Sequence, residues 1–157
     1  MARLGCAAAA AALLLLSART VARAQAPAAG IKVCALVPKA EVKRLIGGTQ
    51  TFDMFPPEEE AIGNYGSSCN YAGVMVQVLP FSQGTIDAAR KRGRLEPVAG
   101  VGDQAFLFEN PQGYAELYVK VGTRLLTLQR DVPTGKKVAD VRAGTVALAQ
   151  ALVAKLR

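Results

Sequence analysis

Alternation of apolar and polar residues marks several short segments of the chain as β-strands. In residues 74–81, valine occupies every second position from 74 to 78. Such alternation is typical of a strand with one buried face. Gly73 predicts a turn before it, so residues 68–72 form the other strand of a hairpin. Comparable segments predict three further strands, over residues 104–109, 114–121 and 124–131.

Three segments have the spacing of amphipathic helices. The first runs from Pro38, which suits the first turn of a helix, to the glycines at 47–48. The second spans residues 84–92, and its final basic residues complement the negative end of the helix dipole. The third and longest spans residues 134–157, where apolar side chains recur at helical intervals among alanines. We expect this last helix to cover the sheet.

Residues 49–67 show neither pattern. The stretch contains adjacent prolines at 56–57, three consecutive glutamates at 58–60 and the sequence Gly-Asn-Tyr-Gly at 63–66. We therefore expect a surface loop here.

The predicted order of elements is αββαβββα. Runs of neighbouring strands without regular alternation with helices favour antiparallel pairing. The sequence therefore predicts an α+β fold, in which helices pack on one face of a five-stranded, mainly antiparallel sheet.

Residues 1–26 predict a secretory signal peptide. A positive charge at Arg3 is followed by an almost wholly apolar run over 4–18, and Ala24-Gln25-Ala26 offers small residues at both cleavage positions. The apolar run is about 15 residues long, whereas a helix that spans a membrane needs about 20. We therefore expect cleavage and no stable membrane anchor afterwards.

The cleavage site has alternatives at 22–24 and 26–28, so the predicted mature chain begins between Gln25 and Ala29. Residues 27–157 are then expected to form a single α+β domain, which is long enough to bury one hydrophobic core. Export predicts a periplasmic or secreted location.

The net charge of the chain is +7, from 19 Lys and Arg against 12 Asp and Glu, and loss of Arg3, Arg19 and Arg23 with the leader reduces it to +4. This small excess is spread over segments such as 90–94 and 136–137. No basic stripe is interleaved with stacking aromatic residues, so we expect solvated surface and no nucleic-acid partner.

The chain contains no histidine and no tryptophan. Ser-His-Asp and Cys-His catalysis, HExxH zinc sites and imidazole pH switches are excluded, because each requires an imidazole. Asp53 and Glu58–Glu60 lack the alternating ligands around a glycine that an EF-hand requires. We therefore predict neither a metal nor a cofactor.

Two cysteines, Cys34 and Cys69, remain after loss of the leader. In an oxidising compartment such a pair tends to close, so we predict a disulfide between them. The pair is not a CxxC redox motif, and two thiolates without histidine make only half of a zinc site.

Several short motifs follow one another in a recognisable order: Cys34-Ala-Leu-Val-Pro38, Leu45-Ile-Gly47, Cys69-Asn-Tyr71 and Gly100-Val-Gly-Asp-Gln-Ala105. Over residues 34–156 this arrangement resembles a family of small exported bacterial proteins, often lipoproteins, of unassigned function. The chain departs from the lipoproteins because no cysteine follows a lipobox. The resemblance implies export, and it brings no catalytic residue with it.

The aromatic residues Phe52, Phe55 and Tyr65 of the expected loop are the candidate partner-binding residues, since an aromatic pair beside acids is typical of a contact site. We expect a non-catalytic binding or interaction module of the bacterial envelope, whose partner is a protein, a peptide or an envelope component. The alternative is a histidine-free hydrolase that acts on an envelope component through paired carboxylates. Its available acids are Glu58, Glu60, Asp103 and Glu116.

Overall fold

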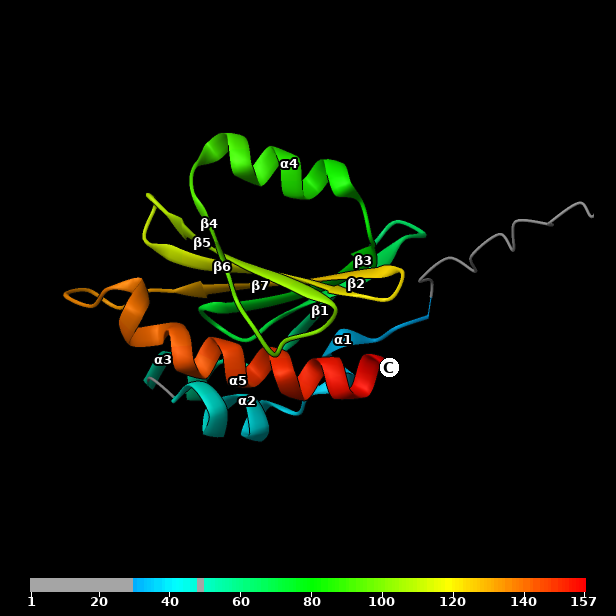
Figure 1. Cartoon of the computed structure of the whole chain (residues 1–157). Helices are drawn as coiled ribbons and strands as arrows, with labels where there is room; N and C mark the ends of the chain where they lie inside the picture. Colours follow the sequence, from blue (N-terminus) through cyan, green and yellow to red (C-terminus); the bar gives the residue numbers. More distant parts are fainter. Residues whose placement is uncertain (1–29, 48–49) are drawn as a thin grey trace, which may run out of the picture.

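A computed structural model describes residues 30–47 and 50–157, and the predicted signal peptide lies outside this part. The described residues form one antiparallel sheet of seven strands in the order β1-β2-β3-β7-β6-β5-β4 (Figure 1). The strands are β1 (Glu58–Ile62), β2 (Gly66–Asn70), β3 (Val74–Pro80), β4 (Leu95–Pro97), β5 (Gln104–Asn110), β6 (Tyr114–Val121) and β7 (Arg124–Asp131). The helices are α1 (Val33–Leu36), α2 (Lys39–Ile46), α3 (Gln50–Met54), α4 (Gln83–Arg92) and α5 (Val138–Leu156).

Strands β3 and β7 hold the sheet together at its centre. Within the described part of the chain, theirs is the one pairing between strands that are not consecutive, with Val76 opposite Leu128. Hairpins extend the sheet through β2 to β1 on one side, and through β6 and β5 to β4 on the other. The two edges of the sheet therefore come from different halves of the chain.

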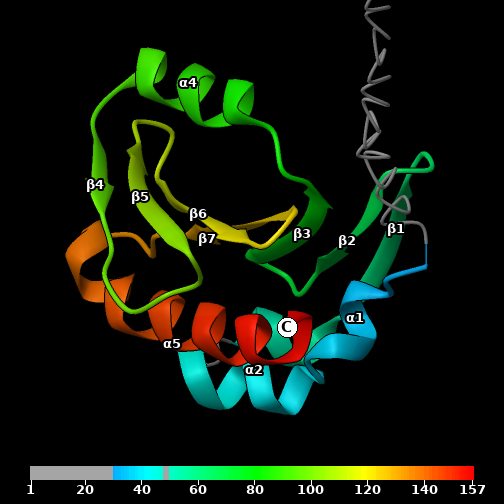
Figure 2. The same ribbon diagram turned by 45° about the vertical axis from the view of Figure 1, so that its right-hand side comes forward.

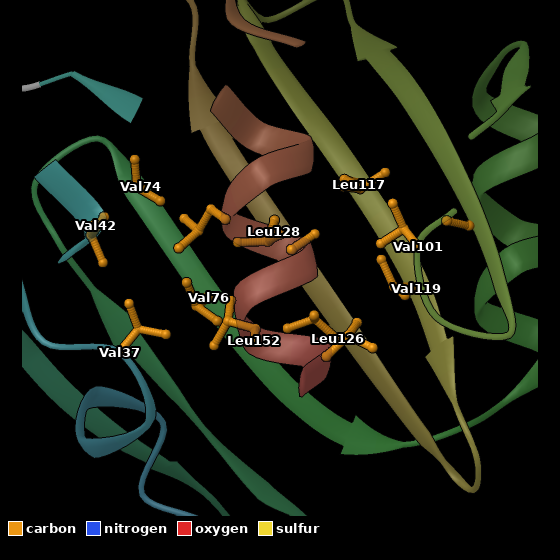
Figure 3. Packing of buried hydrophobic residues seen from close by; sticks show 14 of the residues in the cluster. Val37, Val42, Val74, Val76, Val101, Leu117, Val119, Leu126, Leu128 and Leu152 are labelled. Carbon is orange, nitrogen blue, oxygen red and sulfur yellow. The ribbon is translucent and has the colours of Figure 1, made fainter. Parts of the chain in front are cut away.

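One face of the sheet packs against α5, and α2 packs against the outside of α5 (Figure 2). Alternate residues of β3, β6 and β7 point towards these helices, so Val76, Leu117 and Leu128 are fully buried. Leu152 of α5 lies among them (Figure 3). Burial of each such side chain contributes about 1.5–3 kcal/mol, which makes this face the main source of stability.

Helix α4 covers the opposite face, which corrects the expectation that all helices lie on one side (Figures 1 and 2). Its Ile86 and Ala89 pack against Phe108 of β5, Tyr118 of β6 and Leu125 of β7. These strand residues alternate with those that face α5, so the strands are apolar on both sides here. Because α4 connects β3 to the far edge strand β4, it must pass over the sheet, and this second apolar patch holds it there.

The predicted count of five strands is wrong, because the described residues also form β1 and β4. Strand β1 has the sequence Glu-Glu-Glu-Ala-Ile, and glutamate is depleted in strands, so local preference gave no signal. Strand β4 has only three residues and ends in Pro97, which is typical of an edge. Both strands depend on backbone pairing with a neighbour rather than on their own apolar pattern.

The prediction of a loop over 49–67 is also wrong. The described residues of this range form α3, β1 and the start of β2. The other strands agree closely with the sequence: β6 and β7 have the predicted bounds, and a turn with positive φ at Ala72 and Gly73 joins β2 to β3. Helix α5 begins at Val138, four residues later than predicted, after a turn at Gly135.

None of the described helices is both long and apolar enough to span a membrane.

Candidate functional site

Phe52 is a core residue rather than an exposed contact. It lies in α3, only 2% of its surface is exposed, and it belongs to the main hydrophobic cluster. The Lys39 ammonium lies 5.6 Å from the centre of its ring. Phe52 therefore stabilises the fold near α2, and it is not one of the exposed candidates for contact with a partner.

The other two candidates are exposed, Phe55 to 52% and Tyr65 to 66%. Phe55 follows α3 and precedes β1, while Tyr65 lies in the turn between β1 and β2. The five-residue strand between them is about 17 Å long, so the two rings do not form one cluster. Instead, they stand at the two ends of the sheet edge that β1 forms.

Shallow hollows adjoin the Phe55 end of this edge. One of about 320 Å³ is lined by Phe55, Pro56, Glu58 and Asn70, together with the Ala72–Gly73 turn. A second hollow of about 260 Å³ continues over the same turn. A partner that contacts Phe55 therefore also meets a recessed surface beside the ring.

The glutamates of β1 divide between two roles. Glu59 points towards α1, and its carboxylate accepts hydrogen bonds from the backbone N–H groups of Val33 (2.6 Å) and Cys34 (2.8 Å) and from the Ser67 hydroxyl (2.7 Å). It thereby caps the start of α1. Glu58 and Glu60 point to the other side of the strand and remain exposed. They give the edge its negative charge.

The predicted disulfide is present, with the Cα atoms of Cys34 and Cys69 5.1 Å apart. It ties α1 to β2. Tyr71 supports the same junction, because its buried hydroxyl donates a hydrogen bond to the Val37 carbonyl at 2.7 Å. Burial, with a smaller contribution from the negative charge of Glu59, raises the pKa of Tyr71 to about 12, so the hydroxyl remains a donor at neutral pH.

Glu116 has a buried carboxylate. It is the main polar feature whose structural role was not predicted from the sequence. Its side chain is 8% exposed and accepts hydrogen bonds from Arg92 (2.8 and 3.2 Å), from Asn110 (2.8 Å) and from the Tyr118 hydroxyl. The Arg92 guanidinium also lies 5.0 Å from the centre of the Phe108 ring. The cluster fixes the C-terminal end of α4 to the sheet.

Burial alone would raise the pKa of Glu116, but the hydrogen bonds from Arg92, Tyr118 and Asn110 outweigh it and hold the pKa below its ordinary value. A general acid in a hydrolase needs the opposite shift. The only sequence signal for this cluster was a glutamate between apolar residues in a predicted strand.

The acids considered for a hydrolase do not gather at one site. Glu58 and Glu60 are the two that lie close together, about 7 Å apart along β1, but they stand side by side on one exposed strand rather than facing each other across a substrate. Glu58 and Glu60 lie on β1, four strand spacings from Glu116 on β6, or about 19 Å along the sheet. Asp103 lies in the turn before β5, where it accepts a hydrogen bond from the Gly122 N–H at 2.6 Å. Paired glycosidase carboxylates stand about 5–10 Å apart across a substrate. Within residues 30–47 and 50–157, no three acidic or cysteine side chains gather as metal ligands.

The glycine-rich turn before β5 has a packing role. A Cβ atom at Gly102 would lie 2.5 Å from the Lys120 carbonyl oxygen, and φ at this residue is +59°. Only glycine therefore lets the turn lie against β6, with Val101 buried beneath it.

No model of a known protein family matches the chain, and neither a curated protein nor a solved structure matches it. The resemblance to small exported proteins therefore stays a prediction from the motifs. Function has to be argued from the surfaces of this chain.

Proposed function

We propose that the protein is an exported, non-catalytic interaction module of the bacterial envelope, which binds a protein, a peptide or an envelope component along the edge of β1. The observation that carries the proposal is the open edge of this strand between exposed Phe55 and Tyr65. Of the three residues predicted to bind, Phe55 and Tyr65 contact the partner, whereas Phe52 packs in the core beneath the segment that carries Phe55.

The chemistry of the edge favours binding in three ways. Strand β1 pairs with β2 on one side only, so its outer backbone groups are available to an added strand. Phe55 and Tyr65 supply aromatic surface, which is enriched in the energetically dominant residues of interfaces. Exposed Glu58 and Glu60 attract basic groups and repel acidic ones, which selects among partners.

The disulfide supports the exported location, because such bonds form and persist in oxidising compartments. A disulfide at this place also braces the binding edge. Cys69 lies opposite Glu59 in the β1–β2 pairing, so the covalent bond to α1 is made directly behind the strand that meets the partner.

Site-specific photo-crosslinking tests the proposal. A benzophenone side chain is placed at position 55 or 65 in the mature protein, which is then mixed with the envelope fraction of its own cell and irradiated. We expect a defined adduct from both positions, and we expect Phe55→Ala to weaken the adduct formed from position 65. The matched control places the same probe at Ala88, which is exposed on α4, away from the edge.

An adduct of equal yield from position 88, or no adduct from positions 55 and 65, would contradict the proposal. Melting curves of the labelled proteins show whether the fold is intact, so a negative result cannot be attributed to unfolding.

A further inference from the structure

The hydrogen-bonding register of the sheet fixes which backbone groups lie on the open edge of β1. The Tyr71 N–H donates to the Val74 carbonyl at 2.8 Å, so these two residues form a hydrogen-bonded pair between β2 and β3. Successive residues of an antiparallel strand turn their N–H and C=O groups to opposite neighbours. The odd-numbered residues of β2 therefore turn these groups towards β3, and its even-numbered residues turn them towards β1.

The same alternation continues into β1, which is the edge opposite β4 (Figure 2). Glu58, Glu60 and Ile62 lie opposite the even-numbered residues of β2 and turn their backbone groups to them. The backbone groups of Glu59 and Ala61 consequently point outward, and no described backbone group from outside the sheet bonds to them. A strand added at this edge would thus form its hydrogen bonds with residues 59 and 61.

The side chains of β1 are divided between the two faces of the sheet. Glu59 points towards α1, whose backbone N–H groups hold its carboxylate. Glu58 and Glu60 point to the opposite face, where both are exposed, and neither forms an ion pair with another described residue. One face of the edge therefore carries two carboxylates without a cation beside them.

The register brings a partner's side chains close to these two carboxylates. Opposite residues that do not exchange hydrogen bonds lie nearer to each other in an antiparallel pair, with Cα atoms about 4.5 Å apart against about 5.5 Å for those that do. On the outer side of β1 the nearer positions are those of Glu58 and Glu60, because the hydrogen bonds are made at 59 and 61. Alternate residues of an added strand therefore meet one carboxylate each.

We propose that β1 accepts an extended basic peptide segment as an additional antiparallel strand, with Lys or Arg opposite Glu58 and Glu60. This inference rests on the proposed function and specifies the partner of that edge. The residue between the two basic ones lies opposite Glu59 on the α1 side, where a β-branched residue suits a strand. A polyamine would neutralise the two carboxylates, but it would leave the outward backbone groups unpaired, so the peptide fits better.

An NMR titration of the mature protein with the capped peptide Thr-Lys-Thr-Lys-Thr tests the site. We expect saturable shifts centred on the amides of Glu59 and Ala61, which should also exchange hydrogen more slowly once they are paired. Added salt should weaken binding, because the charge pairs are exposed to solvent. The isomer Thr-Lys-Lys-Thr-Thr has the same charge but places its lysines on opposite faces, so it should bind several-fold more weakly.

Methylation of the peptide backbone tests the register. The threonine N–H groups face β1 in the proposed pairing, whereas the lysine N–H groups face away. N-methylation of the threonines should therefore abolish binding. The matched control carries N-methyl groups on the two lysines, and it should retain the affinity within about threefold.

The double change Glu58→Gln with Glu60→Gln should lower the affinity by about five- to tenfold, since each exposed charge pair contributes modestly. The matched control is Asp87→Asn with Glu109→Gln, which changes the net charge equally at exposed residues of α4 and β5. This control should bind within about twofold of the unmodified protein. All four substitutions are at exposed positions, so unchanged melting temperatures verify that the fold is retained.

Photo-crosslinking from positions 55 and 65 tests the proposed function separately. A crosslinked adduct without peptide binding, or with equal binding of the two peptide isomers, would overturn the basic strand and leave the proposed function standing. Equal effects of the two methylation patterns, with spermidine causing the same shifts, would overturn strand addition. Neither an adduct nor peptide binding would overturn both proposals.

Discussion

Phe52 and Phe55 are three positions apart but have opposite environments, with 2% and 52% of their surfaces exposed. Helix α3 turns Phe52 towards the core, whereas Phe55 comes after the helix has ended and directly before Pro56. The short helix therefore decides which ring stabilises the fold and which is available to a partner.

Single substitutions at these two positions should have different effects. Phe52→Ala is expected to lower the free energy of unfolding by about 3–5 kcal/mol, because it leaves a cavity in the core. Phe55→Ala should change it by about 0.5 kcal/mol or less, as is usual for an exposed side chain. Urea denaturation measures both values, and similar losses for the two variants would contradict this assignment.

Glu116 makes the stability of the protein depend on pH. Its pKa in the folded state lies below the ordinary value of 4.5, so the folded state favours the ionised form. The resulting stabilisation is complete above the pKa of the unfolded chain and is lost as pH falls through the lower pKa of the folded state. The relevant window lies below about pH 4.5.

The variant Glu116→Gln should therefore be less stable by about 1–3 kcal/mol at neutral pH, through loss of charged hydrogen bonds. Its stability should fall less steeply than that of the unmodified protein as the pH is lowered through this window. Thermal melting at a series of pH values gives the comparison. Parallel curves for the two proteins would show that Glu116 is not the titrating group.

The disulfide and the inward valines of β3 were predictable from the sequence, because their signals are local. One is a pair of thiols in a chain predicted to be exported, and the other is the alternation of buried and exposed positions along a strand. Sequence reasoning placed Phe52 on the surface, since nothing in the sequence around two prolines and three glutamates indicates helix α3. It considered Glu116 only as a catalytic acid, because its partners Arg92 and Asn110 come from other elements.

At the scale of single elements, α1 is the helix that depends most clearly on contacts with other parts of the protein. The four-residue helix is too short to be stable alone, and it is fixed by the disulfide, by Glu59 and by Ser67, whose hydroxyl lies 3.2 Å from the Val33 nitrogen. The disulfide was predictable from the sequence, whereas the acidic cap was not, because β1 itself was not predicted.

Removal of the disulfide should therefore act on α1 and on the edge of the sheet. The double variant Cys34→Ser with Cys69→Ser is expected to lose about 2–4 kcal/mol of stability, within the range for a loop of this length. Reductant should lower the melting temperature of the unmodified mature protein and leave that of the variant unchanged. Two free thiols in the denatured, unreduced mature protein would refute the bond.

At the scale of the whole molecule, both edges of the sheet are poor templates for further copies of the chain. Strand β1 presents Glu58 and Glu60, so pairing with the same strand of another copy would bring like charges together, and β4 is short and contains proline. The α+β class followed from the order of predicted elements. The extra strands and the second helical layer did not, because they depend on contacts between distant segments.

The mature protein isolated from the envelope should begin between Gln25 and Ala29. This prediction rests on the small residues that follow the apolar run, which lies outside the described part of the chain. Intact-mass measurement checks it directly. A mass that includes Met1, found in a membrane fraction, would contradict cleavage.

The central pairing of β3 with β7 also sets when the fold can be completed. Every other strand pair among the described residues joins strands that are consecutive in the sequence, but Val76 must wait for Leu128, which is synthesised much later. Closing so large a loop is slow, and until then β3 has an unsatisfied side. A chain synthesised only as far as β6 can form the local β1–β2–β3 and β4–β5–β6 hairpins, but the two halves of the sheet remain separate until β7 joins them.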